Sequence, residues 1–193
     1  VIAVANAGDV LGTINDQAEN VAADPTSNAG NQTATGEITF ADVDLTDRPT
    51  ATEAKSSITA KAQGGGVLAL TTDQENAIDA AFSITNVVGN TNDGTVTWAY
   101  DINETDLDFL GAGEVVTAVF TITVTDDEGA TDTQDVTVTI HGANDHPVIA
   151  VANAGDVLGT INDQAENVAA DPTSNAGNQT ATGEITFADV DLT

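Results

Sequence analysis

The sequence predicts an all-β protein, an antiparallel sandwich of seven or eight short strands. Apolar side chains alternate with threonine in several runs, and clusters of glycine with asparagine or aspartate separate these runs. Although the formal net charge is -28, 40% of the residues are hydrophobic, so the chain has enough apolar surface to fold. Its 193 residues give room for one domain of ordinary size and part of a second.

The clearest strands lie in the second half of the chain, at residues 95–100, 115–125 and 133–140, where alternation is longest. We expect them to be consecutive strands that run antiparallel. The turns that precede the first and the last of them contain Gly94 and Gly129, which are expected to supply a positive φ. The remaining elements are shorter: strands at 37–43, 57–62, 66–71 and 82–88, a first strand at 1–5 or 10–14, a helix within 71–81, and a polar loop at 21–35.

The chain contains an internal repeat. Residues 148–193 copy residues 1–46 without one change, which sets a period of 147 residues. This predicts one complete repeat, residues 1–147 with a linker at 141–147, followed by a partial second repeat. The expected partners are neighbouring identical repeats in the same chain. We expect the N-terminal copy to complete the sandwich, and the C-terminal copy to be loosely ordered or to exchange strands with another molecule.

The charge balance limits the ligands of the chain. Lysine and arginine total 3 against 31 aspartate and glutamate residues, so electrostatic binding to nucleic acid or to an anionic membrane surface is excluded. No apolar stretch is long enough for insertion into a bilayer. Because the chain has no cysteine, it has neither disulfides nor thiolate metal sites. Its ionic partners are expected to be hard cations.

The order of the strands brings acidic side chains to both ends of the sandwich. The chain leaves the last strand at one end, which we name the linker pole, and the loop after Tyr100 must share that end. This loop includes Glu104 and Asp108. The turn after residue 125 lies at the opposite end, which we name the turn pole. The candidate metal ligands are Asp101, Asn103, Asp106, Asn144 and Asp145 at the linker pole, and Asp42, Asp44, Asp47, Asp126 and Asp127 at the turn pole.

In a row of repeats the linker pole of one faces the turn pole of the next. Asn144 and Asp145 are then expected to face Asp189 and Asp191, the second copies of Asp42 and Asp44. Two carboxylates about 4 Å apart repel by roughly 1 to 4 kcal/mol, and a divalent cation removes that repulsion. Calcium accepts six to eight oxygen ligands in tolerant geometry, which suits loops of aspartate, asparagine and carbonyl groups. The alternative is that these loops are solvated and neutralised only by diffuse counterions.

Two segments resemble a known family. Residues 98–147 contain an LGAGE turn at 110–114 and a VTVTI-x-G-x-ND ending before Pro147, and GEITFADVDLTD spans 36–47. They resemble the VCBS-type, cadherin-like repeats of giant RTX biofilm adhesins. The resemblance implies an Ig-like extender that lies outside the cell on the bacterial surface and projects a distal adhesive domain. The chain departs from the family pattern in its longer N-terminal segment and in lacking GGxGxD nonapeptides.

The sequence contains few of the residue patterns that enzymes use for catalysis. Serine is rare and never stands in a GxSxG turn, and His141 and His146 lack a nearby third nitrogen or sulfur ligand for zinc. Trp98 and Tyr100 share the face of Val96 and are predicted to be core residues. We therefore expect a calcium-stabilised spacer and no enzyme. The alternative is a glycan- or cell-surface-binding module acting through exposed loops such as residues 21–35, although near identity between repeats favours the spacer.

Overall fold

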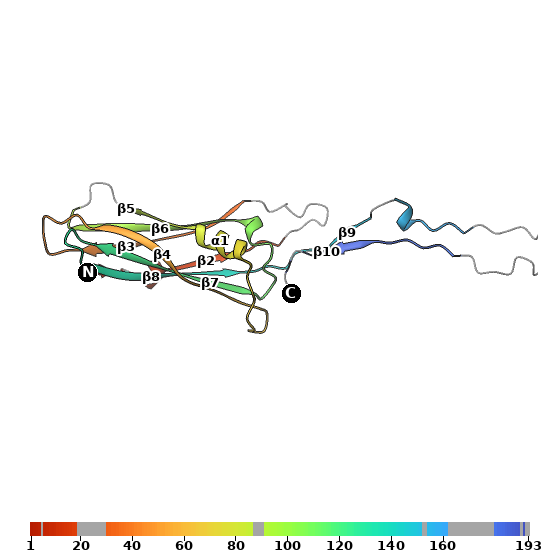
Figure 1. The fold of residues 1–193 in the computed structure, drawn as a ribbon, viewed down its shortest axis with the longest axis horizontal. Helices are drawn as coiled ribbons and strands as arrows, with labels where there is room; N and C mark the ends of the chain where they lie inside the picture. The colour runs from red at the N-terminus through yellow and green to blue at the C-terminus, as the bar shows by residue number, and fades with distance from the viewer. Residues whose placement is uncertain are drawn as a thin grey trace, which may run out of the picture. The chain divides into compact units, whose positions relative to one another are not determined.

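The computed structural model describes residues 1–4, 6–18, 30–86, 91–151, 154–161, 180–189 and 191. The chain divides into two compact units (Figure 1). The first unit comprises residues 1–146 together with residues 190–193, and the second comprises residues 147–189. None of the described helices is long and apolar enough to cross a membrane.

The first unit confirms the predicted all-β, Ig-like sandwich. Each of its two sheets has four strands. In order across the first sheet they are β1 (Ile2–Ala3), β3 (Asn31–Ala41), β6 (Asp93–Asn103) and β5 (Phe82–Asn86). The second sheet contains β2 (Leu11–Asn15), β8 (Thr131–His141), β7 (Val115–Thr125) and β4 (Thr50–Lys61). Neighbouring described strands are antiparallel except for β2 and β8, which run parallel with Leu11 opposite Thr137.

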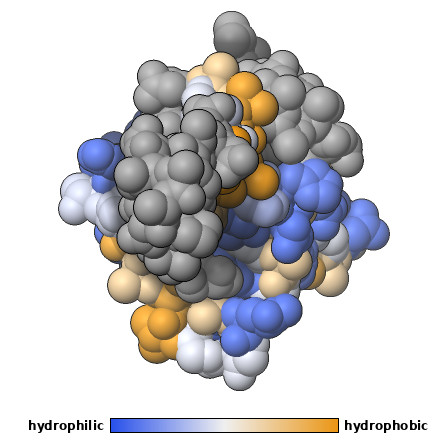
Figure 2. Space-filling model, turned by 90° about the vertical axis from the view of Figure 1, so that its right-hand side faces the viewer, coloured by the Kyte–Doolittle hydropathy of each residue, from blue (hydrophilic) through white to orange (hydrophobic). Residues whose placement is uncertain are grey.

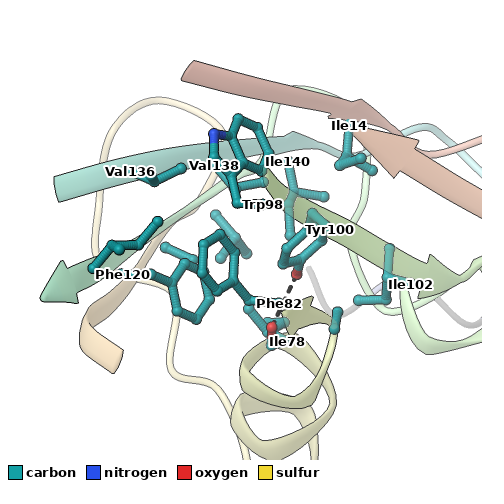
Figure 3. Close-up of a cluster of buried hydrophobic side chains, with 14 of the residues drawn as sticks. Ile14, Ile78, Phe82, Trp98, Tyr100, Ile102, Phe120, Val136, Val138 and Ile140 are labelled. Carbon is teal, nitrogen blue, oxygen red and sulfur yellow. Dashed lines mark hydrogen bonds between the residues drawn. The ribbon is translucent and has the colours of Figure 1, made fainter. Parts of the chain in front are cut away.

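The core lies between the two sheets and is built from the inward-facing residues of the long central strands (Figure 3). Trp98 and Tyr100 are fully buried, as predicted. The ring of Phe82 stacks on that of Phe120 with their centroids 4.1 Å apart. The hydroxyl group of Tyr100 donates a hydrogen bond of 3.1 Å to the carbonyl oxygen of Ile78, so the single buried phenol has a partner.

Ile78 belongs to the predicted short helix, α1 (Thr72–Ala80). Its start is fixed by a capping box, in which Thr71 Oγ1 accepts a hydrogen bond from Gln74 N and Gln74 Oε1 accepts one from Thr71 N. The two remaining described helical turns of the first unit are η1 (Ala7–Val10) and η2 (Glu104–Asp106).

Trp98 fixes the N-terminal segment against the sheet. Its indole Nε1 donates a hydrogen bond of 2.6 Å to the carbonyl oxygen of Asp9 in η1. The approach is possible because residue 36 is glycine: a Cβ atom there would lie 2.5 Å from Nε1 of the indole. Gly36 stands opposite Trp98 in the β3–β6 ladder.

Several sequence expectations need correction. Strand β3 begins at Asn31, inside the stretch predicted as a polar loop, because Gln32 and Ala34 pack inward while Thr33 and Thr35 face solvent. Residues 66–71 form no strand and make only an isolated bridge between Val67 and Lys61. The two candidate first strands both exist, as β1 and β2.

The two predicted glycine turns differ in outcome. Gly129 has φ 90° and closes the turn between β7 and β8, as predicted. Gly94 lies within β6, opposite Phe40, and is not among the described glycines with a positive φ. Strand β6 begins at Asp93, so Gly94 lies inside the strand and not in the turn that precedes it.

The second unit reproduces part of the first. Strand β9 (Val148–Ala150) pairs with β10 (Thr186–Ala188), placing Ile149 opposite Phe187. The corresponding residues of the first copy, Ile2 and Phe40, are paired in the same register. The helical turn η3 (Ala154–Val157) likewise corresponds to η1.

Candidate metal centres

The turn pole brings three carboxylates together. Asp42 follows β3, Asp47 precedes β4, and Asp126 follows β7. Because Thr50 of β4 pairs with Thr125 of β7, the loops that carry Asp47 and Asp126 meet at the same end of the sandwich. One carboxylate oxygen from each aspartate lies within 4.8 Å of the other two. We name this group the turn-pole triad.

Asp47 is the buried member of the triad. Its side chain is only 4% exposed, and its Oδ2 atom is buried without a hydrogen-bond partner. Burial raises the pKa of Asp47, the negative charges of Asp42 and Asp44 raise it further, and a side-chain hydrogen bond with Glu128 opposes the shift. The charge of Asp47 in turn raises the pKa of Glu128. A buried carboxylate oxygen without a hydrogen-bond partner, beside other acids, is costly to the folded state unless a proton or a cation neutralises it.

Backbone hydrogen bonds hold the loops of the turn pole in place. Asp44 N donates to Asp42 Oδ1 at 3.0 Å, and Asp47 N donates to Asp44 O at 3.1 Å. Asp126 Oδ1 accepts hydrogen bonds from Glu128 N and Ala130 N at 3.0 and 2.7 Å. The cation nearest in sequence, Arg48, donates its guanidinium Nη1 to the carbonyl oxygen of Asp47 at 2.6 Å. The triad is therefore preorganised by its loops.

The linker pole contains a second group of acids, from different strands. Asp16 follows β2, Glu104 begins η2 after β6, and Asp145 lies in the linker after β8. All three are buried, and Glu104 is only 1% exposed. We name them the linker-pole cluster. Glu104 Oε2 is buried without a hydrogen-bond partner, as is Oε1 of the neighbouring Glu114.

Hydrogen bonds connect this cluster to the linker. Asp16 Oδ2 accepts a hydrogen bond of 3.0 Å from Ala143 N, while Glu104 Oε1 accepts one from Gln17 N. Gly142 N donates to the carbonyl oxygen of Glu114 at 3.1 Å. The first residues of the linker are therefore fixed to the sandwich.

The electrostatics of the linker pole resemble those of the turn pole. Burial raises the pKa of Asp16 to about 8; the hydrogen bond from Ala143 opposes this, and Glu104 and Asp145 add to it. Burial also raises the pKa of Asp108 to about 6, with further contributions from Asp145 and Glu104. Both shifts reflect burial of acidic groups close to one another at this pole.

The predicted ligands fall into two groups. Asp42, Asp47 and Asp126 form the turn-pole triad, and Asp145 belongs to the linker-pole cluster. Asp44 and Asp127 lie in the same turn-pole loops with exposed side chains. Asp127 Oδ2 accepts a hydrogen bond of 3.3 Å from Arg48 N.

The loop after Tyr100 contributes a different residue from those selected by sequence. Asp101 is exposed and accepts a hydrogen bond of 2.5 Å from Asn31 Nδ2. Asn103 Oδ1 caps η2 by accepting a hydrogen bond of 3.1 Å from Thr105 N. Asp106 is exposed as well, whereas Glu104 is buried. Metal binding by Asp101, Asn103 and Asp106 stays a prediction.

The linker residues and the second-copy acids are placed as follows. Asn144 Nδ2 donates to the carbonyl oxygen of Asp145 at 2.6 Å. Asp191 belongs to the first unit. The Oδ2 atom of Asp191 accepts a hydrogen bond of 3.3 Å from Asp145 N. The Cγ atom of Asp191 lies 3.4 Å from the position that a Cβ would take on Gly111. Asp189 belongs to the second unit.

The sequence contains a signal for the buried acids that were missed. Asp16 stands two residues after Ile14, and Glu104 stands two residues after Ile102, both inward-facing residues of their strands. Glu114 stands two residues before Val116 in the same way. Since strand side chains alternate, each of these acids continues the inward face beyond the end of a strand. An acid in that register is aimed at the end of the core.

Among the described residues, the buried acids at both poles offer oxygen ligands. Carboxylates with flanking backbone carbonyls suit a hard divalent cation, and His141 is exposed. Residues 21–35, the exposed loop predicted for a glycan- or cell-surface-binding module, are described only from residue 30. Residues 31–35 belong to β3, and residues 21–29 lie outside the described part of the chain.

No known protein-family model matches this sequence, and comparison with curated proteins finds no significant match.

Proposed function

We propose that each 147-residue repeat is a calcium-stabilised spacer of a bacterial cell-surface adhesin. The observation that carries the proposal is the turn-pole triad, in which Asp47 is 4% exposed and keeps an unpartnered Oδ2 atom beside Asp42 and Asp126. A buried carboxylate in this position destabilises the fold on its own and is stabilising when a cation is bound. Diffuse counterions reach exposed loops but neutralise a buried oxygen poorly.

Calcium fits the ligands better than the other common cations. The acids come from separate loops, and calcium tolerates irregular sets of six to eight oxygens, whereas magnesium requires a tight octahedron and retains water. Zinc prefers nitrogen and sulfur ligands, and the chain has no cysteine. A calcium ion in the triad would join the 42–47 loop to the turn after β7.

The linker pole supports the spacer role. Asp191 is the second copy of Asp44, and it accepts the hydrogen bond from Asp145 N at the end of the first repeat. An acid of the following repeat thus reaches the pole that already holds Asp16 and Glu104. Calcium shared between these groups would stiffen the junction, so that a row of repeats extends as a rod and projects a distal adhesive domain.

The proposal is tested by thermal melting in excess EGTA and in millimolar calcium, with magnesium absent. Binding to the folded state alone stabilises it by about 2.7 kcal/mol per site at a hundredfold excess over Kd. We expect calcium to raise Tm by many degrees. Coinciding melting curves would falsify the calcium site.

A pair of variants assigns the effect to the triad. Asp47→Asn removes the buried charge, and Glu37→Gln removes one charge from the exposed face of β3. We expect Asp47→Asn to lose part of the stabilisation by calcium and Glu37→Gln to keep it. If both variants respond as the natural sequence does, calcium acts elsewhere. A glycan array with the calcium-loaded protein separates the spacer from the adhesive-module alternative, since a spacer binds no glycan.

A further inference from the structure

The outward faces of the two sheets of the first unit differ in charge. Strand side chains alternate, so the neighbours of each buried residue face outward. On the sheet of β2, β8, β7 and β4, the outward residues of the described strands include one acid, Asp135, and one lysine, Lys61. On the sheet of β1, β3, β6 and β5 they include three acids and no base: Glu37, Asp93 and Asp101. In a chain with a net charge of -28, the first of these faces has no formal net charge.

Threonine fills most of this neutral face. The cross-strand pairing places four threonines in one row across the whole sheet: Thr13, Thr139, Thr117 and Thr59. Two further rows cross β4, β7 and β8 near the turn pole: Thr52, Thr123 and Thr133, and then Thr50, Thr125 and Thr131. The preference of threonine for exposed strands explains its frequency, but it does not explain why acids avoid this face and not the other. We name the outward residues of these four strands the threonine face.

The middle of the threonine face is apolar. Thr137 pairs with Leu11 on one side and with Val119 on the other. Leu11 is 57% exposed, although it is a large aliphatic residue. Asp135 Oδ1 accepts a hydrogen bond of 2.7 Å from Thr121 Oγ1. An apolar centre surrounded by polar residues, with few charges, is the composition of a protein–protein interface.

The acids of the turn pole lie away from the middle of this face. From Thr121 to Asp126 the extended chain spans about 17 Å. This span exceeds the Debye length of about 8 Å at physiological ionic strength, so the charge of the pole is largely screened in the middle of the face. On the face of the molecule shown in Figure 2, the most hydrophilic residues likewise gather in patches, with hydrophobic residues between them.

We propose that the threonine face is an interface at which two copies of this protein pack side by side. The partner is the same face of a second copy, related by a twofold axis, so two surfaces without net charge meet. The corresponding contact through the sheet of β1, β3, β6 and β5 would bring together the three acids of each copy, which repel each other. Packed sheets lie about 10 Å apart, and the threonine methyl groups with Leu11 and Val119 would fill this space.

The area of the face predicts a weak contact. Four strands about 4.8 Å apart, with about 3.3 Å per residue, cover roughly 600 Å². Two such faces bury about 1,200 Å², which is the lower limit for a specific interface, and we expect dissociation constants of about 0.1 to 1 mM. Chains that repeat the same 147 residues carry the face at equal intervals, so several weak contacts can form together and strengthen one another.

Lysine substitutions separate this contact from overall charge repulsion. T123K/T137K adds two cations to the threonine face, and T95K/T97K adds two to the outward face of β6, at positions that are half-buried in both cases. Both variants lower the net negative charge equally, so nonspecific repulsion falls equally. Sedimentation equilibrium of the full chain, up to about 2 mM protein and at about 0.15 M salt, measures association in calcium and in EGTA. Fluorescence of Trp98, the single tryptophan, checks that each variant is folded.

We expect the natural sequence to form dimers with a dissociation constant in the range given above. T123K/T137K should weaken the dimer by at least about tenfold, because the lysines of both copies meet in it. T95K/T97K should strengthen the dimer or leave it unchanged. Single chains of the natural sequence at every concentration would overturn the proposal, and so would equal changes in the two variants.

Cross-linking tests the same contact without added charge. Because the chain has no cysteine, Val119→Cys and Thr97→Cys each introduce a single thiol at a half-buried position of a central strand. A bis-maleimide reagent that spans about 10 Å should join the Val119→Cys chains faster than the Thr97→Cys chains. Equal rates would contradict the twofold contact. None of these substitutions changes an acid of the two poles, so failure here leaves the calcium proposal standing, and failure of the calcium proposal leaves this contact standing.

Discussion

At the scale of single residues, two acids with raised pKa values predict how the stability of the protein depends on pH. Asp16 and Asp108 have pKa values raised to about 8 and about 6 by burial and by neighbouring acids. A raised carboxyl pKa means that the folded state binds more protons than the unfolded state between the two pKa values. Without a metal, stability therefore falls as pH rises from about 4 to about 8.

This predicts a melting temperature in EGTA that is higher at pH 5.5 than at pH 8. A stability difference of about 2 kcal/mol corresponds to roughly 4–8 °C for a chain of this size. On the proposed function, calcium would replace protons at the same acids, so in millimolar calcium the difference should shrink or reverse. Differential scanning calorimetry at the two pH values measures it. Equal melting temperatures without calcium would show that these acids are solvated.

A single substitution should have opposite effects with and without calcium. Asp16→Asn keeps an acceptor for Ala143 N but removes a buried negative charge. Without calcium at pH 8 we expect it to stabilise the fold by about 1–3 kcal/mol. In calcium it should stabilise less or destabilise, because a ligand is lost. Denaturant unfolding in both conditions gives the two signs. A loss of stability in both conditions would mean that Asp16 serves the fold rather than a metal.

At the scale of secondary structure, alternation predicted most strands but not their pairing. The runs around Trp98, Phe120 and Val138 are central strands. The parallel position of β2 beside β8 depends on a segment more than a hundred residues away, which no local pattern contains. The polar start of β3 was missed because half of its residues face solvent as threonine and asparagine. Asp42, Asp47 and Asp126 were predicted to lie at the turn pole, and the structure brings them together there. Asp16 was missed because the sequence did not distinguish β2 from β1.

The repeat provides a matched test of how β3 packs. Gly36 and Gly183 occupy the same position in the two copies. A Cβ on Gly36 would meet the indole of Trp98 at 2.5 Å, whereas Gly183 is exposed. We expect Gly36→Ala to destabilise by about 1–3 kcal/mol and Gly183→Ala to change stability by less than about 0.5 kcal/mol. Urea unfolding followed by Trp98 fluorescence compares them. Equal effects would contradict the close packing of Trp98 on β3.

For the whole molecule, the proposed function predicts that calcium at the two poles stiffens the junction between repeats. In calcium, three or four tandem repeats should scatter X-rays as an extended rod, and chelation should make the row flexible. Asn144→Ala with Asp145→Ala should reproduce the chelated behaviour while each sandwich stays folded, because these residues lie in the linker. Small-angle scattering gives the maximum dimension. A dimension unchanged by chelation would mean that the short linker with Pro147 is stiff without a metal.

The parallel pairing of β2 with β8 determines how a repeat resists pulling. Both strands run toward the linker pole, β2 is attached to the N-terminus, and β8 leads directly to the linker. Tension between the two ends of a repeat therefore slides these strands past each other along their length. The hydrogen bonds from Leu11 to Asn15 share that load and must break together, whereas a hairpin pulled open from its end loses its bonds one at a time. A row of such repeats is loaded in shear, and the parallel ladder that carries this load is the five-residue pairing of β2 with β8.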